Sequence, residues 1–212
     1  MENEQIEVAK RLLAINTIKI QPDIPFTWAS GWKSPIYCDN RKVLSFPETR
    51  TFLCRQFVKL MIEKYPNAEV VAGVATGAIA HGVLVAEALQ LPFIYIRSKP
   101  KGHGLENLIE GDIQPGSKVV VIEDLISTGG SSLSAVEAIR NYGADVLGML
   151  AIFTYNFPLA TRNFQEADVE LTTLSNYNLL LKLAYDSGEI SDEQLESLND
   201  WRKNPETWGQ KR

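Results

Sequence analysis

The residues from 119 to 131 combine side chains that could bind a phosphorylated sugar. They read VVVIEDLISTGGS, which predicts a buried strand, two adjacent carboxylates at its exit, a loop of hydroxyl and glycine residues, and a helix that begins near Ser131. Small residues let the backbone N–H groups of 127–131 converge on a phosphate at the positive end of the helix dipole. Glu123 and Asp124 would repel that phosphate unless they accept hydrogen bonds from vicinal sugar hydroxyls. The order of these parts predicts a ribose 5-phosphate site.

The alternative interpretation of this segment is purely structural. In that case the two acids end a strand, and the residues Ser127 to Gly130 cap a helix. Each part alone fits this interpretation equally well, but all the parts in this order favour a binding site. No Gly-Lys-Ser/Thr follows, which excludes a Walker A loop, and no G-x-G-x-x-G occurs, which excludes the dinucleotide fingerprint.

A second segment carries positive charge. Residues 97–104 read RSKPKGHG and hold three full cations without an acid, in a chain with a net charge of −5. Residues 98–117 contain no convincing helix or strand pattern, which in a compact domain predicts a functional lid. Mobile cations can close over a departing diphosphate and exclude water. The alternative is a solvated basic loop on the surface.

The elements that must position these segments alternate between strand and helix. Five apolar runs have strand length and are too continuous to have one solvated face, which is typical of buried parallel strands; they are 70–72, 93–96, 119–122, 146–153 and 169–174. Helical patterns at 78–89 and 131–141 separate them. The sequence therefore predicts an α/β fold with a layered parallel sheet, in which ligands bind beyond the carboxyl ends of the strands.

Both ends of the chain fall outside this alternation. Helical spacing predicts helices at 3–15, 47–64 and 178–184, and Ser191 to Gln194 form a capping box before another helix. Short extended pieces at 26–28 and 36–38 are separated by a turn. We expect one domain over 1–212, with a core at about 46–174 and an accessory layer built from about 1–45 and 175–212.

Composition restricts the class of protein. The chain has 212 residues, of which 45% are hydrophobic and 22% charged, so it can bury a core and is not disordered. The negative net charge argues against nucleic-acid binding. Two cysteines and two histidines do not form a zinc set. Neither a signal peptide nor an apolar run of about 20 residues is present, so we expect a cytoplasmic protein without a membrane segment.

The thirteen residues from 119 to 131 resemble the phosphoribosyl-diphosphate (PRPP) motif of type I phosphoribosyltransferases. Residues 26–41, FTWASGWKSPIYCDNR, together with the basic segment 97–104, are similar to the branch of this family that uses orotate. The resemblance covers about 20–155 and contains three motifs in order.

This resemblance implies a fold, an activity and partners. The fold is a Rossmann-like parallel sheet flanked by helices, with a small hood from the two chain ends over the base. The activity is transfer of the 5-phosphoribosyl group from PRPP to orotate in pyrimidine (UMP) biosynthesis, giving orotidine 5-phosphate and diphosphate. Mg²⁺ is held mainly through PRPP, without a direct protein ligand. The lid reaches the neighbouring subunit's active site, which implies a homodimer.

The resemblance also implies roles for individual residues. Arg97, Lys101 and His103 match the lid residues that contact diphosphate, and Lys101 is the candidate catalytic cation. Glu123 and Asp124 match the ligands of the ribose hydroxyls. The residues that match the 5-phosphate loop are Leu125, Ile126, Ser127, Thr128, Gly129, Gly130 and Ser131. Ser127 also matches a position that touches orotate, and Tyr37 and Cys38 match a segment whose backbone meets the base.

Three positions depart from patterns seen in some members. Residues 73–78 lack a lysine, Ser98 stands where a second basic residue can follow Arg97, and Thr154 and Tyr155 occupy a place where an arginine can pair with the orotate carboxylate. Lys33 or Arg41 is the expected substitute for that arginine. Two other functions stay open: a phosphoribosyltransferase for another base, and a PRPP-sensing regulator without catalysis. The lysine-bearing lid favours catalysis.

Overall fold

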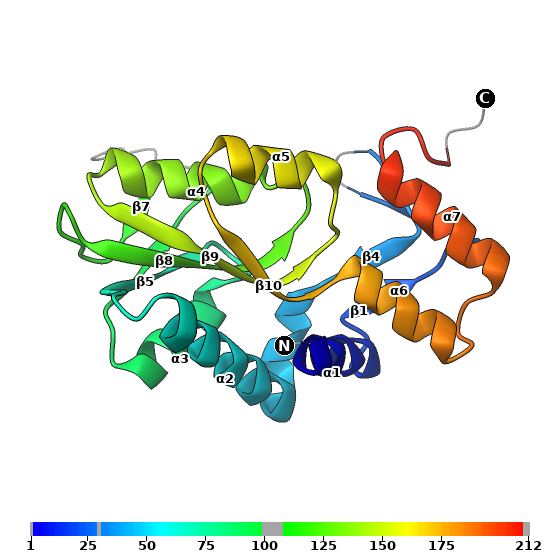
Figure 1. Cartoon of the computed structure of the whole chain (residues 1–212), viewed down its shortest axis with the longest axis horizontal. Coiled ribbons are helices and arrows are strands. Elements are labelled where there is room, and N and C mark those ends of the chain that lie inside the picture. The colour runs from blue at the N-terminus through cyan, green and yellow to red at the C-terminus, as the bar shows by residue number, and fades with distance from the viewer. Residues whose placement is uncertain (1, 29–30, 99–107, 210–212) are drawn as a thin grey trace.

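The structure is a computed structural model that describes residues 2–28, 31–98 and 108–209. At its centre is a six-stranded sheet with the order β10-β9-β8-β5-β6-β7 (Figure 1). The strands are β5 (Val70–Val74), β6 (Phe93–Ile96), β7 (Ile109–Glu110), β8 (Lys118–Ile126), β9 (Asp145–Thr154) and β10 (Leu171–Asn176). Neighbouring strands are parallel except for β6 and β7, which are antiparallel. The predicted α/β fold with a parallel sheet is confirmed.

Helices cover both faces of this sheet. Figure 1 shows α2 (Pro47–Lys64) and α3 (Ile79–Leu89) on one face, and α4 (Gly130–Asn141) and α5 (Pro158–Glu166) on the other. All five residues of β5 are buried, as are the residues of β9 from Gly148 to Thr154. Burial on both faces explains why these strands are continuous apolar runs rather than alternating patterns. None of the helices in the described ranges is long and apolar enough to cross a membrane.

Two elements of the α/β core were not predicted from the sequence. Strand β7 lies inside the range 98–117, for which no element was expected, and it consists of two residues that pair only with β6. A strand of that length has no periodicity to detect. Helix α5 was not predicted either, although Pro158 stands at its first position, where proline is tolerated.

Segments from both chain ends pack together beside the sheet. Helix α1 (Glu2–Ala14) lies against α6 (Tyr177–Asp186), and α7 (Asp192–Lys203) follows (Figure 1). Strand β1 (Ile18–Ile20) pairs with β4 (Ile36–Cys38), and β2 (Phe26–Thr27) pairs with β3 (Lys33–Ser34). The 3₁₀-helix η1 (Asn40–Ser45) leads from β4 to α2. We call this layer, residues 2–28, 31–45 and 175–209, the hood.

An aromatic cluster joins the hood to the end of β9. The Trp28 ring centroid is 5.2 Å from that of Tyr155 and 5.7 Å from that of Trp201. Trp201 is fully buried, and its indole N–H donates to the carbonyl of Lys33 at 3.1 Å. Large buried rings dominate packing energy, and a buried indole N–H needs an acceptor. The cluster thus fixes the N-terminal hood strands against α7.

Candidate active site

A cavity of about 370 Å³ opens where β5 and β8 end side by side. It is lined by Cys38, Asp39, Arg41, Val74, Ala75, Thr76, Gly77, Glu123, Asp124, Leu125 and Ser131. The cavity therefore brings together the hood segment after β4, the loop after β5, and the acidic end of β8. Carboxyl ends of adjacent parallel strands are the expected place for a ligand site in an open α/β sheet.

Both predicted acids lie within β8 rather than beyond its end. The expectation that this strand stops at residue 122 is wrong, because β9 continues alongside and pairs Leu125 with Phe153 and Ile126 with Thr154. Successive side chains of a strand point to opposite faces. Glu123 and Asp124 consequently have different surroundings.

The Glu123 carboxylate is turned into the protein. Its exposed fraction is 4%, and its two oxygens accept hydrogen bonds of 2.8 Å from the Ser132 hydroxyl and the Asp124 backbone N–H. Burial raises the pKa of Glu123 well above its ordinary value, and the nearby Asp124 charge raises it further. Glu123 thus connects β8 to the first turn of α4.

Asp124 is the more open of the two acids, and two contacts fix its position. A Cβ atom at Gly77 would lie 2.5 Å from Oδ1 of Asp124 and closer still to Oδ2, so only glycine leaves room for this carboxylate. The backbone carbonyl of Asp124 accepts a 2.6 Å hydrogen bond from the side-chain amide of Asn40. The loop after β5 and the hood therefore both position Asp124.

Asn40 and Gly77 were not singled out from the sequence. Asn40 is fully buried at the start of η1, and its side-chain oxygen accepts from the Cys38 thiol at 3.4 Å. Asp124 is 84 residues away in sequence. No local pattern could have indicated this contact.

The predicted phosphate loop, residues 125–131, includes the end of β8 and the start of α4. Helix α4 begins at Gly130, one residue earlier than expected, and only residues 127–129 separate it from β8. Gly129 has a φ of +84°, and a Cβ there would meet the Phe164 ring at 2.7 Å, so glycine is required. No side chain in the described part of the molecule caps the N-terminus of α4. Its free N–H groups suit an anion.

A contact from α5 fixes this loop. The side-chain amide of Asn163 donates to the carbonyl of Thr128 at 2.9 Å. Ser127 and Thr128 do not line the 370 Å³ cavity, and Thr128 instead lines a separate hollow with Trp32 and Phe157. The cavity thus contains only part of the predicted phosphate loop.

The two predicted base-contacting residues lie differently. Cys38 lines the cavity and is 9% exposed, whereas Tyr37 does not line it and is 38% exposed. Burial raises the pKa of the Cys38 thiol well above its ordinary value, with smaller contributions from Asp124 and Asp39. A thiol with a raised pKa stays neutral, which agrees with its role as a donor to Asn40.

The predicted lid residues are only partly described. Arg97 forms an ion pair with Glu110 on β7, with an Nη1–Oε1 distance of 3.3 Å, and it does not line the cavity. Lys101 and His103 lie outside the described residues.

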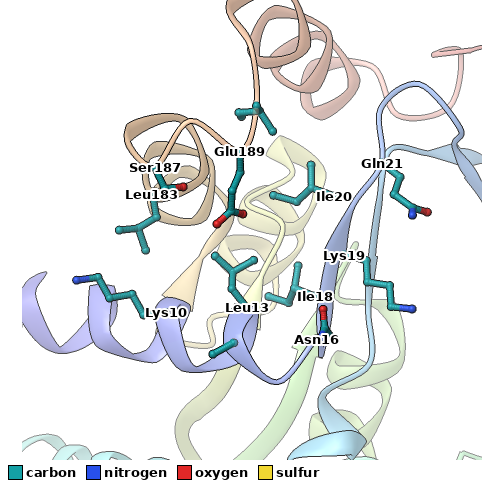
Figure 2. Close-up of a pocket in the computed structure, with 12 residues that line it drawn as sticks. Lys10, Leu13, Asn16, Ile18, Lys19, Ile20, Gln21, Leu183, Ser187 and Glu189 are labelled. Atoms are coloured by element: carbon teal, nitrogen blue, oxygen red, sulfur yellow. The ribbon is translucent and has the colours of Figure 1, made fainter.

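A larger hollow lies elsewhere. The hood contains a groove of about 740 Å³. Figure 2 shows Leu183 and Glu189 on the side of this groove opposite Leu13 of α1. Apolar and polar side chains line the groove in equal number, and none of the predicted site residues is among them. Size alone therefore does not identify the site.

The family is established by comparison with known proteins. A model of the phosphoribosyl transferase domain matches residues 51–173, which include the loop after β5, the acids of β8 and the phosphate loop. The fold and this site together define the chain's class, the phosphoribosyltransferases.

Relatives narrow this class. The orotate phosphoribosyltransferase of Phocaeicola vulgatus is 59% identical over 200 residues, covering 94% of each chain. That of Porphyromonas gingivalis is 57% identical, covering 95% of this chain and 96% of the relative. The crystal structure of orotate phosphoribosyltransferase from Aeropyrum pernix superposes with a TM-score of 0.75 at 25% identity, covering 87% of this chain and 99% of that one. This chain belongs to the orotate phosphoribosyltransferase family.

Proposed function

We propose that the cavity at the ends of β5 and β8 is where this chain transfers the 5-phosphoribosyl group of PRPP to orotate. The products are orotidine 5-phosphate and diphosphate, and the reaction is a step of pyrimidine biosynthesis. The observation that carries this assignment is a single cavity shared by Cys38 of the hood, Asp124 of β8 and Ser131 of α4. In this proposal Cys38 lies on the side of the base, Asp124 accepts from the ribose diol, and Ser131 lies at the edge of the phosphate loop.

The chain's own residues have distinct tasks in this scheme. Asp124 accepts hydrogen bonds from the ribose hydroxyls. The Glu123 carboxylate accepts a hydrogen bond from the backbone N–H of Asp124 and so holds Asp124 in place. Residues 125–131, from the end of β8 to the start of α4, hold the 5-phosphate with backbone N–H groups. Breaking the C1–O bond leaves positive charge on the ribose and negative charge on the diphosphate. Arg97, Lys101 and His103 stabilise the leaving diphosphate, with Lys101 as the catalytic cation.

No protein nucleophile is required in this scheme. A ring nitrogen of orotate forms the new bond to C1 as the diphosphate leaves with the bonding electron pair. Ser127 and the backbone of residues 37–38 bind and orient orotate. Hydroxyl groups in the site therefore bind substrate rather than attack it.

The donor set fits a magnesium ion that arrives with PRPP. The described residues contain no cluster of three or more His, Cys, Asp or Glu side chains that could hold a metal by themselves. Mg²⁺ keeps several waters and binds through few carboxylates plus substrate phosphates. The half-buried Asp124 carboxylate would contact the ribose hydroxyls of PRPP and would reach the ion only indirectly, through them. When bound, Mg²⁺ neutralises charge on the diphosphate.

We also propose a cytoplasmic homodimer in which each lid serves the partner's site. Mixing two inactive variants tests this arrangement. Lys101→Ala keeps an intact cradle, and Asp124→Ala keeps an intact lid. If sites are shared, a mixed dimer contains one complete site, and unfolding-refolding the mixture restores activity that neither parent has. Mixtures without activity would refute a lid that crosses the interface.

Direct turnover tests the main proposal. Purified protein is mixed with PRPP, Mg²⁺ and orotate, and the loss of orotate absorbance is followed together with diphosphate release. Uracil, adenine and guanine are tested in parallel, and EDTA serves as the metal control. Diphosphate release with another base and not with orotate would overturn the assignment. Ribose 5-phosphate binding without turnover of any base would indicate a sensor.

A further inference from the structure

The candidate cavity contains one positive side chain among its described lining residues, Arg41. The other charged groups in that lining are Asp39, Glu123 and Asp124. Orotate differs from uracil by a carboxylate, which is an anion throughout the physiological pH range. A site that prefers orotate needs a cation near the base, and the acidic lining makes that need stronger.

One nitrogen of the Arg41 guanidinium group, Nε, binds a neighbouring carboxylate. Its Nε donates to Oδ1 of Asp39 at 2.6 Å. The Arg41 side chain is 61% exposed, whereas that of Asp39 is 17% exposed. The hydrogen bond from Arg41 lowers the pKa of Asp39, so Asp39 is ionised and the pair is intact at neutral pH. The two Nη groups of Arg41 make no hydrogen bond to a residue in the described ranges, so they can bind an anion end-on.

The backbone that carries Arg41 is fixed next to the reacting side of the cavity. Asn40, the preceding residue, is fully buried and binds the Asp124 carbonyl at 2.6 Å. Tyr37 and Asp124 lie close enough to raise the pKa of Arg41, after the larger effect of Asp39. Arg41 therefore lies beside both the ribose acid and the hood segment proposed for the base.

Other cations near the hood are directed elsewhere. The Lys33 ammonium donates to the Thr27 hydroxyl at 2.8 Å, and Lys33 does not line the cavity. The Arg50 guanidinium donates to the carbonyl of Leu44 at 2.8 Å. Tyr155 is 2% exposed and packs among aromatic rings, so it offers no charge to a ligand.

From this geometry we infer that Arg41 is the specificity-determining residue of the site, binding the carboxylate of orotate through its two Nη groups. The inference rests on the proposed function. Arg41 acts on the acceptor and not on PRPP, so it distinguishes orotate from bases without a carboxylate. Asp39 acts as a positioning residue that holds the guanidinium.

The test compares two substrates in one variant. In Arg41→Gln, the KM for orotate is expected to rise about 10- to 100-fold, the range for a lost charge-assisted hydrogen bond. The KM for PRPP and the inhibition constant of uracil are expected to stay at their wild-type values. Arg41→Lys keeps the charge without the planar fork and should recover part of the affinity.

Lys42→Gln is the matched control. Lys42 is the next residue of η1, and its ammonium donates to the carbonyl of Asn16, away from the cavity. A rise in the KM for PRPP with Arg41→Gln would assign Arg41 to the diphosphate and overturn the inference, as would an unchanged KM for orotate. Failure of the wild-type chain to use orotate would instead refute the proposed function, whatever Arg41 does.

Discussion

Replacing Gly77 by alanine should lower kcat/KM for PRPP because the new methyl group displaces the Asp124 carboxylate. The stability of the fold should hardly change. A Cβ at this position lies 2.5 Å from Oδ1 of Asp124, and ordinary contacts begin at 3.4 Å, so the carboxylate has to move by about 1 Å. A displacement of that size in a positioned group costs on the order of 10²-fold in rate, or about 2.7 kcal/mol of transition-state stabilisation. We therefore expect kcat/KM for PRPP to fall about 100-fold in Gly77→Ala. The melting temperature should change little, because the displaced group is the end of a half-buried side chain.

A double-mutant cycle decides whether the loss passes through Asp124. The variants are Gly77→Ala, Asp124→Ala and the combination, each assayed for kcat/KM with PRPP at saturating orotate. If the added methyl group acts only by moving the carboxylate, the double variant is no worse than Asp124→Ala alone. Additive losses would refute this reasoning and would place the effect in the loop backbone. A large drop in melting temperature would refute it as well.

Three further changes test the rest of the site. Lys101→Ala should lower kcat more than it weakens PRPP binding, and an unchanged kcat would remove Lys101 from its catalytic role. Glu123→Gln should stabilise the fold above neutral pH, because the raised pKa of Glu123 means that ionisation destabilises the folded state as pH rises from the ordinary value of 4.5. The difference in melting temperature should disappear below pH 4.5, and a pH-independent difference would contradict the assignment. Asn40→Ala leaves the partly buried Asp124 carbonyl without its donor, so urea unfolding should show a loss of about 1–3 kcal/mol, together with weaker PRPP binding. Loss of stability with normal PRPP binding would reduce Asn40 to a structural role.

The parts of the fold that local sequence could predict are the long and fully buried ones. Strand β6 spans the predicted 93–96, and α2 spans the predicted 47–64. The capping box at Ser191 and Gln194 is present as predicted, with both reciprocal hydrogen bonds. In contrast, β7 exists only because β6 offers it an edge, and the extension of β8 to Ile126 depends on β9 alongside. Pairing between strands decides where these strands begin and end. The hydrophobic periodicity of a single strand carries no information about that pairing.

The site residues likewise divide into those that local sequence predicts and those that it does not. Glu123, Asp124 and Gly129 follow from their order along one segment, because strand, loop and helix are consecutive there. Asn40 and Gly77 act on Asp124 from two other segments. Their importance depends on how three elements meet in space. The sequence could not predict the unequal burial of Glu123 and Asp124 either, since that burial depends on how far β8 continues.

The contact between Trp201 and the backbone of Lys33 sets an order of events during synthesis. Ribosomes add roughly 5–20 residues per second, so residue 201 emerges on the order of ten seconds after residue 38. All six strands of the sheet are complete before α7 exists. A nascent chain can therefore complete β5, β8 and the loop that leads into α4 first, while the hood is completed only by the last helix. Chains that terminate early would be expected to retain the phosphate loop and lose the packing that holds β2 and β3.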